Sequence, residues 1–326
     1  MEQDNPLAGL RARMRLPLIA APMFLVSGIE LVGAACEHGV IGAFPTVNCR
    51  TPDELDAWLR EITDRLARTA DAGGSAPAPV CPNLIVHHSN RRLHDDLAVL
   101  LRHRPEIVIT SVGSPAPVIS PLHDIGALVL ADVATIRHAE RAIAAGADGL
   151  VLLTAGAGGQ TGWLNPFAFV RAVRAFFAGP IVLAGGISDG QALRAAEMLG
   201  CDLAYMGTKF IATRESMADD RYKAMLVESS ADDVMLTSAF TGLPTSMLRP
   251  SIIAAGLDPD HLPARGAIEI GADIDVGARE AGPKRWRDVW SAGHAASGVT
   301  DIPAVAALVA RTAEEYRRAG LQGAAG

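Results

Sequence analysis

"VLLTAGAGGQTGW" (residues 151–163) carries the clearest signal for the fold. The stretch begins as an apolar run without alternation, which is typical of a parallel strand that is covered on both faces. It continues into a loop in which four glycines surround one long side chain, that of Gln160. Glycines let the backbone approach a ligand closely. The stretch therefore predicts a buried parallel strand with a binding loop at its carboxyl end.

Seven more short apolar runs occur in the chain, and amphipathic stretches separate most of them, as in β-α units around a parallel sheet. Eight strands close a (β/α)8 barrel, so we predict an α/β protein of the TIM-barrel type. A doubly wound open sheet is the alternative, because periodicity does not report closure. The predicted strands are 16–22, 39–44, 81–86, 106–111, 126–132, 148–154, 180–186 and 202–208. The predicted helices are 28–38, 52–68, 91–103, 134–145, 166–177 and 189–199.

The pattern changes after the eighth strand, where the β-α alternation stops. We expect residues 1–216 with 291–326 to form the barrel, and residues 217–290 to form a smaller, mostly helical lid domain that is inserted after strand 8. Residues 301–320 have the pattern of a final amphipathic helix that returns to the barrel. Arg249, in the lid, either receives an anionic substrate tail or belongs to a solvated turn.

The composition favours a globular protein that binds a small molecule. Of 326 residues, 49% are hydrophobic and 20% are charged, and the net charge of -7 offers no basic surface to nucleic acid or anionic lipid. Apolar runs end well short of the roughly 20 residues of a membrane helix. We therefore expect a cytoplasmic protein without a membrane or nucleic-acid partner, and leave a homodimer open. The four cysteines lack ligand spacing, which indicates buried thiols and no metal site.

Two glycine-containing loops follow the seventh and eighth strands, namely "LAGGIS" (183–188) and "YMGTKF" (205–210). In a barrel of this type, the loops after these two strands often bind phosphate. Gly185, Gly186 and Gly207 leave backbone N–H groups accessible, and Thr208 adds a hydroxyl. These loops predict a site for one phosphate, and the alternative is that the glycines only form tight turns.

The first and third strands add candidate ligand contacts. Pro22 and Met23 follow the first strand, where an extended backbone and a polarisable side chain suit a flat heteroaromatic ring. Met23 taken alone is more often a core-packing residue. Asn83 lies inside an apolar run, and is either a ligand contact or a barrel-interior amide with all of its hydrogen bonds satisfied.

Together these motifs resemble the nitronate monooxygenase (formerly 2-nitropropane dioxygenase) family of FMN-dependent barrels, which includes NADH:quinone reductases and enoyl-acyl-carrier-protein reductases. The similarity runs from "PLIAAPM" (17–23) to "WSAGH" (290–294), and is most specific in "GADGLVLLTAGAGGQTG" (146–162), "PIVLAGGISDG" (180–190) and "CDLAYMGTKFIATRES" (201–216). Barrels of the IMP dehydrogenase type have similar phosphate loops, but the chain has no cysteine placed as a nucleophile after the sixth strand.

The resemblance implies FMN as the cofactor and a contact for each motif. It implies that "WSAG" (290–293) closes over the cofactor from the lid side. By this resemblance, the isoalloxazine ring is lined by Ala21, Pro22 and Met23, and the flavin is also contacted by Asn83. The ribityl-phosphate runs beside Gly158 and Gly159. The FMN phosphate is held by Gly185, Gly186, Gly207 and Thr208.

The chain departs from the family at two positions. Members typically have a histidine at position 160 as the proposed base or proton donor, and this chain has Gln160. An amide forms hydrogen bonds but does not take up a proton, so we expect Gln160 to be a catalytic-site contact that is not a base. Many members have a lysine at the end of the fifth strand, where this chain has Ala131 and Asp132. We expect Asp132 to be a helix N-cap, with proton transfer as the alternative.

Three activities remain open. The leading hypothesis is oxidation of alkyl nitronates with O2 without a histidine base. The second is a flavin reductase that takes electrons from NADH or NADPH and acts on a quinone or an enoyl thioester. The third is a catalytically degenerate flavin-binding protein. If a residue other than Gln160 moves protons, the further candidates are Asp132, His87, His88 and His294.

Overall fold

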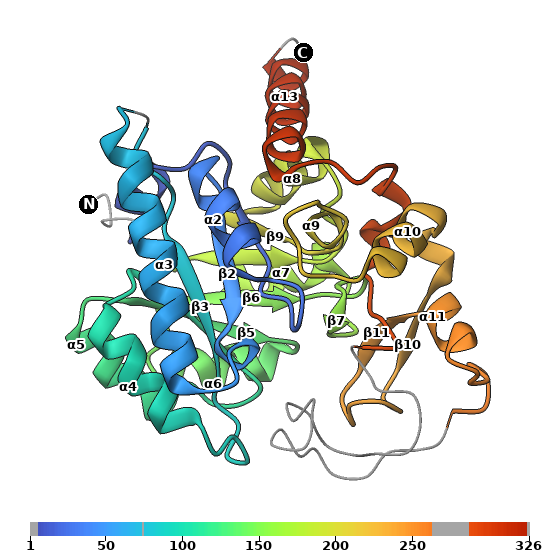
Figure 1. Ribbon diagram of the computed structural model, residues 1–326, viewed down its shortest axis with the longest axis horizontal. Coiled ribbons are helices and arrows are strands. Elements are labelled where there is room, and N and C mark those ends of the chain that lie inside the picture. The colour runs from blue at the N-terminus through green and yellow to red at the C-terminus, as the bar shows by residue number, and fades with distance from the viewer. Residues whose placement is uncertain (1–5, 74, 263–286, 325–326) are drawn as a thin grey trace.

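A closed barrel of eight parallel strands forms the body of the protein (Figure 1). The computed structural model describes residues 6–73, 75–262 and 287–324. Around the barrel the strands are β1 (Leu18–Ala20), β2 (Ile41–Pro45), β3 (Val80–Ile85), β4 (Ile107–Ser111), β5 (Leu128–Val133), β6 (Gly149–Leu153), β8 (Ile181–Ala184) and β9 (Leu203–Met206). β1 pairs in parallel with both β2 and β9, which closes the barrel. The predicted TIM barrel is confirmed, and the open-sheet alternative is wrong.

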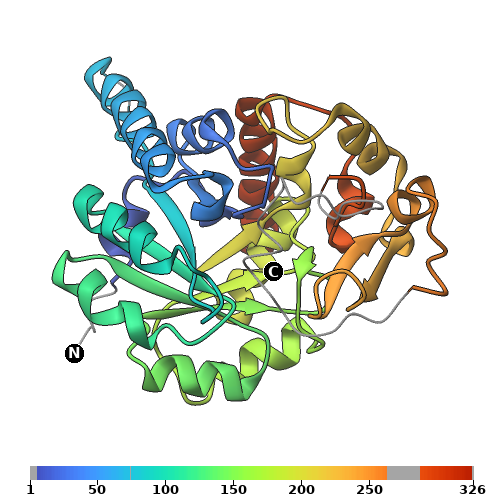
Figure 2. The same ribbon diagram turned by 60° about the horizontal axis from the view of Figure 1, so that its bottom comes forward.

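Helices cover the outside of the barrel, as Figure 2 shows. They are α2 (Ile29–Glu37), α3 (Pro52–Asp71), α4 (Leu93–His103), α5 (Ala116–Asp124), α6 (Ile136–Ala144), α7 (Pro166–Arg174) and α8 (Gly190–Leu199), with the short α1 (Ala8–Arg11) before β1. The six predicted helices are confirmed. The sequence analysis missed α5 because its segment contains Pro117 and Pro121. Pro117 lies in the first turn, where a helix tolerates proline, whereas Pro121 lies inside the helix.

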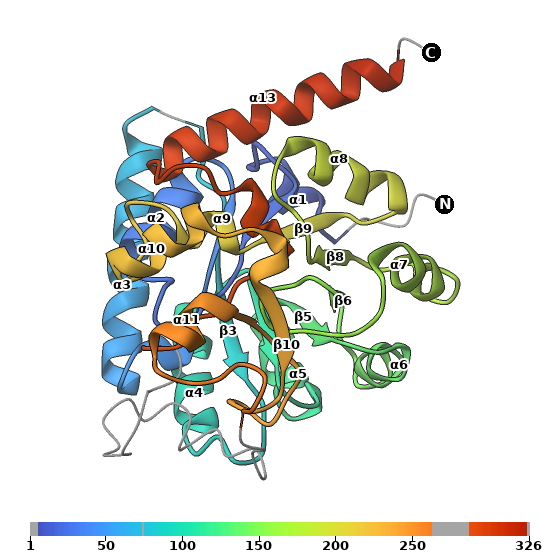
Figure 3. The same ribbon diagram turned by 90° about the vertical axis from the view of Figure 1, so that its right-hand side faces the viewer.

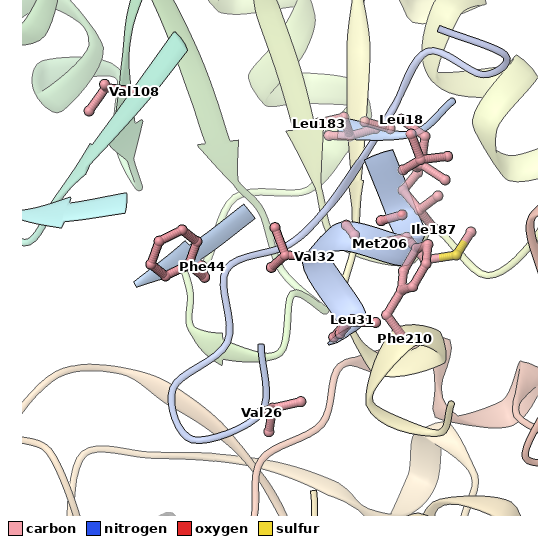
Figure 4. Packing of buried hydrophobic residues seen from close by; sticks show 14 of the residues in the cluster. Leu18, Val26, Leu31, Val32, Phe44, Val108, Leu183, Ile187, Met206 and Phe210 are labelled. Carbon is pink, nitrogen blue, oxygen red and sulfur yellow. The ribbon is translucent and has the colours of Figure 1, made fainter. Parts of the chain in front are cut away.

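Side chains fill the barrel interior below its mouth. The interior cluster contains one or more inward-facing residues from each strand, and Leu7 and Leu10 join it from the N-terminal segment. A second cluster lies between strands and helices. It includes Leu18, Phe44 and Phe210, whose side chains are fully buried (Figure 4). Burial on both faces explains why the strands are continuous apolar runs.

The segment after β9 contains strands as well as helices. It consists of α9 (Thr208–Ile211), α10 (Asp220–Glu228), β10 (Val234–Thr237), β11 (Thr245–Leu248) and α11 (Arg249–Ala254), with 3-10 turns at Ala231–Asp233 and His294–Gly298. β10 and β11 form an antiparallel sheet with β7 (Gly159–Gln160), which belongs to the glycine-rich loop after β6. The expectation of a mostly helical lid missed this sheet. The domain boundaries at 217 and 290 stay a prediction, and residues 263–286 of the expected lid lie outside the described residues.

The final helix, α13 (Val305–Ala324), confirms the predicted amphipathic helix. It packs against α8 and α2 (Figure 3). The backbone N–H of Val305 donates hydrogen bonds to the carboxylate of Glu215, which ties the start of α13 to the segment after β9. Within the described residues, the structure has no helix with the length and apolar character needed to cross a membrane.

Candidate functional site

One pocket at the barrel mouth brings together all eleven site residues that were predicted from the sequence. They come from the carboxyl ends of β1, β3, β8 and β9 and from the loop after β6. The residues are Ala21, Pro22, Met23, Asn83, Gly158, Gly159, Gln160, Gly185, Gly186, Gly207 and Thr208. Their shared position is a structural finding, and the contact proposed for each of them stays a prediction.

Hydrogen bonds fix the loop after β1 in its conformation. The side-chain amide of Asn48 donates to the carbonyls of Met23 and Ser27, at 3.0 and 2.8 Å, and accepts from the N–H of Leu25 at 2.9 Å. Leu25 has a φ of +59°, which a non-glycine residue rarely adopts. The hydroxyl of Ser27 accepts from the N–H of Met23 and donates to the carbonyl of Ala21. The wall from Ala21 to Met23 is therefore ordered by the protein's own contacts.

Backbone lines the part of the pocket at the ends of β8 and β9, next to the loop after β1. Gly185 and Gly186 have φ values of +128° and +73°, which favour glycine. A Cβ at Gly185 would lie 2.5 Å from the hydroxyl oxygen of Thr154. The predicted turn geometry at these glycines is thus present, and it leaves backbone in the pocket wall.

The segment 290–293 packs closely on this glycine side. A Cβ at Gly158 would lie 2.8 Å from the backbone N of Gly293. The same N–H of Gly293 donates to the hydroxyl oxygen of Thr208 at 3.0 Å. Because a threonine hydroxyl both accepts and donates, Thr208 retains its own O–H for a ligand.

The antiparallel sheet of β10, β11 and β7, which we call the lid sheet, holds the backbone at Gln160. In the β7–β11 pair, Gln160 lies opposite Thr245. The next residue, Thr161, donates its backbone N–H to the carbonyl of Pro244 and its hydroxyl to the carbonyl of Thr154. Gln160 is half-buried and lines the pocket. Its side chain is therefore presented from a paired strand, where the sequence analysis expected an irregular loop.

Asn83 is only partly satisfied by the protein. Its side chain is 5% exposed, and its oxygen accepts a hydrogen bond from the hydroxyl of Ser111 at 3.1 Å. Its amide nitrogen Nδ2 is buried without a hydrogen-bond partner. Of the two interpretations left open by the sequence, the fully satisfied interior amide is wrong, because one donor remains for a ligand.

Asp132 does not cap a helix, contrary to the expectation. It belongs to β5, and the N-cap of α6 is Thr135, whose hydroxyl accepts from the N–H of His138 at 3.1 Å. Asp132 lines the pocket, and its Oδ1 is buried without a partner. Burial raises the pKa of Asp132 to about 8. A carboxyl group with this pKa is largely protonated at neutral pH.

The other candidate side chains lie outside the pocket wall in the described part of the chain. His87 contacts the hydroxyl of Ser89 through Nδ1 at 2.7 Å. Its ring lies 4.2 Å from that of His88. His294 is exposed and lies beside the loop after β6. In the lid, Arg249 begins α11 and pairs with the exposed carboxylate of Asp260 at 2.8 Å.

Two tyrosines in the pocket wall were missed by the sequence analysis. Tyr205 is 8% exposed, and its hydroxyl is buried without a partner. Its position two residues after Leu203 on the same strand face was an available signal. Tyr222 lies on α10 and stacks on Trp290, with ring centroids 5.0 Å apart, and donates to the carbonyl of Ser291. No strand pattern marked Tyr222 in the sequence.

These residues fit a flavin. Apolar side chains of Met23, Leu153 and Ile187 line the pocket and suit a flat ring. The buried Nδ2 of Asn83 lacks a partner that a ring carbonyl would supply. The backbone at Gly185 and Gly186 suits an anionic tail.

The comparisons with known proteins agree with this fit. The sequence pattern that defines the nitronate monooxygenase family matches residues 75–315. A nitronate monooxygenase of Paraburkholderia phytofirmans is 29% identical, over 93% of this chain and 92% of that protein. The (3aS,4S,5R,7aS)-5-hydroxy-7a-methyl-1-oxo-octahydro-1H-indene-4-carboxyl-CoA dehydrogenase of Mycobacterium tuberculosis is 26% identical, over 73% of this chain and 64% of that protein.

The fold has a close counterpart among solved structures. The nitroalkane oxidase of Streptomyces ansochromogenes superimposes with a TM-score of 0.80 at 24% identity, over 97% of this chain and 99% of that one. At this identity the likeness concerns the fold, whereas the family match rests on sequence. The chain belongs to the nitronate monooxygenase family and is a flavin-dependent oxidoreductase.

Proposed function

We propose that the protein uses FMN to oxidise alkyl nitronates with O2, and that it does so without a base at position 160. The observation that carries this proposal is the amide of Gln160 in the pocket wall, on a backbone that β11 holds in place. The pairing with β11 supports a defined position for this side chain. An amide does not accept a proton at working pH, so it cannot convert a neutral nitroalkane into its nitronate.

The flavin in this proposal is FMN. In this proposal Gly185, Gly186, Gly207 and Thr208 hold a single phosphate, mostly through backbone N–H groups. Gly158 and Gly159 lie beside the ribityl-phosphate, and the wall formed by Ala21, Pro22 and Met23 packs on the ring. The position of the glycines at the ends of β8 and β9 supports this assignment, because barrels commonly bind phosphate there.

The side chains of the pocket orient the substrate and do not deprotonate it. A flavin held by the glycine loops and by Ala21, Pro22 and Met23 would supply the electron transfer between donor and acceptor. The NH2 group of Gln160 donates a hydrogen bond to a nitronate oxygen and fixes the substrate over the ring. Burial raises the pKa of Asp132 to about 8, so in this proposal it is largely protonated at neutral pH and serves as a hydrogen-bond donor. The substrate therefore arrives as the preformed anion.

A second candidate function is the reduction of a quinone or an enoyl thioester with electrons from NADH or NADPH. The relative named as a carboxyl-CoA dehydrogenase favours this candidate, because its name specifies a thioester. Hydride transfer from a nicotinamide also needs no base, so Gln160 is compatible with it.

Anaerobic mixing separates the two candidates. The FMN-loaded protein is mixed with propionate 3-nitronate, NADH or NADPH, and loss of flavin absorbance is followed. The nitronate is expected to bleach the flavin rapidly, and the nicotinamides slowly. Rapid bleaching by NADH or NADPH with no response to nitronate would establish the second candidate instead. A protein that binds no FMN would refute both.

A further inference from the structure

Three polar side chains form a layer on top of the apolar barrel interior. Inward-facing residues alternate along a strand, so the position two residues beyond a member of the interior cluster also faces inward. Asn83, Asp132 and Tyr205 occupy such positions at the carboxyl ends of β3, β5 and β9. They follow Cys81, Leu130 and Leu203 of the interior cluster. All three polar residues line the pocket. We call them the polar floor.

Each member of the polar floor has a buried polar atom without a partner. These atoms are Nδ2 of Asn83, Oδ1 of Asp132 and the hydroxyl oxygen of Tyr205. Buried polar groups in folded proteins nearly always have hydrogen-bond partners. Three such atoms in one wall of one pocket therefore indicate a ligand that supplies the missing partners.

The floor carries no positive charge. Two titratable groups of neighbouring residues interact electrostatically with the carboxyl group of Asp132. They are the hydroxyl of Tyr205 on β9 and the thiol of Cys81 on β3. Burial raises the pKa of both groups well above their ordinary values, so both are neutral. Burial raises the pKa of Asp132 as well. A protonated Asp132 is a hydrogen-bond donor, as are the amide of Asn83 and the hydroxyl of Tyr205.

We propose that Asp132 is held as a neutral acid that donates a hydrogen bond to an acceptor atom of the flavin ring, beside donors from Asn83 and Tyr205. This inference rests on the proposed binding of FMN in the pocket. The flavin ring system offers carbonyl oxygens and unprotonated ring nitrogens, which accept such bonds. Three neutral donors thus recognise the ring.

Loss of the Asp132 proton reverses its effect on binding. An ionised carboxylate only accepts hydrogen bonds, and it repels the carbonyl oxygens that the acid attracted. FMN affinity should consequently fall as pH rises through the pKa of Asp132. Asparagine keeps the shape and the donor but cannot lose a proton in this range, so Asp132→Asn is the matched control.

The test compares FMN dissociation constants of the wild type and Asp132→Asn between pH 6 and 9.5, measured by quenching of flavin fluorescence. The wild-type constant should rise up to about tenfold per pH unit above pH 8, while that of the variant stays within about twofold after the titration of FMN itself is subtracted. Parallel curves for the two proteins overturn the proposal for Asp132 and leave the proposed function intact. Absence of FMN binding by the wild type at every pH overturns both.

An infrared titration of the FMN-free protein provides a readout that does not depend on the cofactor. A protonated carboxyl band that persists at pH 7 and disappears as pH rises through about 8 supports the neutral acid. Its assignment is checked by its absence in Asp132→Asn, and Tyr205→Phe should retain it. If no protonated carboxyl band remains at pH 6 and above, the proposal is overturned.

Discussion

The pocket wall presents two kinds of surface, backbone and polar side chains. The glycine side, formed by Gly158, Gly185, Gly186 and Gly207, presents backbone. The rest of the wall presents the polar floor and Gln160, which are side chains with specific hydrogen-bonding properties. Backbone N–H groups recognise an anionic tail whatever reaction follows, whereas side chains decide whether protons move. In our proposal, the glycine side binds the cofactor and a few side chains set the chemistry.

Substitution on the glycine side should have the largest effect. In Gly185→Ala, the new Cβ meets the hydroxyl of Thr154 at 2.5 Å while the backbone keeps a φ of +128°. Strain of roughly 1–3 kcal/mol plus this clash should displace the loop, and we expect FMN affinity to fall about 100-fold. Gly9→Ala is the control, since nothing lies within 4 Å of its Cβ. Equal FMN affinity in the two variants would show that the loop at Gly185 does not bind the cofactor.

Substitution of the amide should change the reaction rather than the binding of FMN. Gln160→His places a group that can take a proton on the same paired backbone. We expect turnover of neutral nitroalkanes to rise about tenfold or more, with FMN affinity nearly unchanged. Gln160→Leu removes hydrogen bonding without adding a base, so it should not gain this activity. No gain in the histidine variant would mean that another group limits proton abstraction.

The polar floor makes stability depend on pH. Asp132 has a folded pKa of about 8, above its ordinary value of 3.8, so the folded state keeps a proton that the unfolded state has lost. The free energy of unfolding should therefore decrease as pH rises from about 4 to about 8, by up to about 1.4 kcal/mol per pH unit from this group. Urea unfolding of the wild type and Asp132→Asn at several pH values measures this slope. A wild type that loses no more stability than the variant over this range would contradict the raised pKa.

The smallest expected effect belongs to the hydroxyl of Thr208. In Thr208→Val, the N–H of Gly293 loses its acceptor and the site loses one hydrogen-bond donor. A single hydrogen bond contributes about 1 kcal/mol, so FMN affinity should fall about fivefold. Thr208→Ser retains the hydroxyl and should bind FMN almost as the wild type does. If Thr208→Val binds FMN as tightly as the wild type does, the hydroxyl does not contribute to binding.

The barrel was predictable because each of its strands is a continuous apolar run with a polar boundary. The glycine side was predictable for a related reason, since glycines at the ends of β8 and β9 coincide with the usual phosphate position of such barrels. The lid sheet was not predictable. β7 is two residues long, Gly159–Gln160, and pairs with β11 from a segment more than eighty residues later in the chain. Neither strand has enough residues to show alternation, so only the tertiary structure reveals the pairing.

Asp132 shows how a local rule can fail at a functional position. An aspartate a few residues before a helix is a good N-cap candidate, but β5 continues to Val133 and Thr135 takes the cap. The inward direction of Asp132 follows from strand alternation after Leu130, which becomes certain only when the strand end is known. Its unusual protonation depends on burial among residues of other strands, and no sequence pattern reports that.

The central claim is that the pocket accepts a nitronate and does not make one. The direct measurement is the anaerobic rate of flavin bleaching at pH 7 by propionate 3-nitronate and by the corresponding neutral nitroalkane, with the wild-type protein. The account predicts rapid bleaching by the nitronate and, for the nitroalkane, a rate no higher than that of its spontaneous ionisation in buffer. Bleaching by the nitroalkane much faster than this ionisation would contradict it, because the protein would then contain a working base.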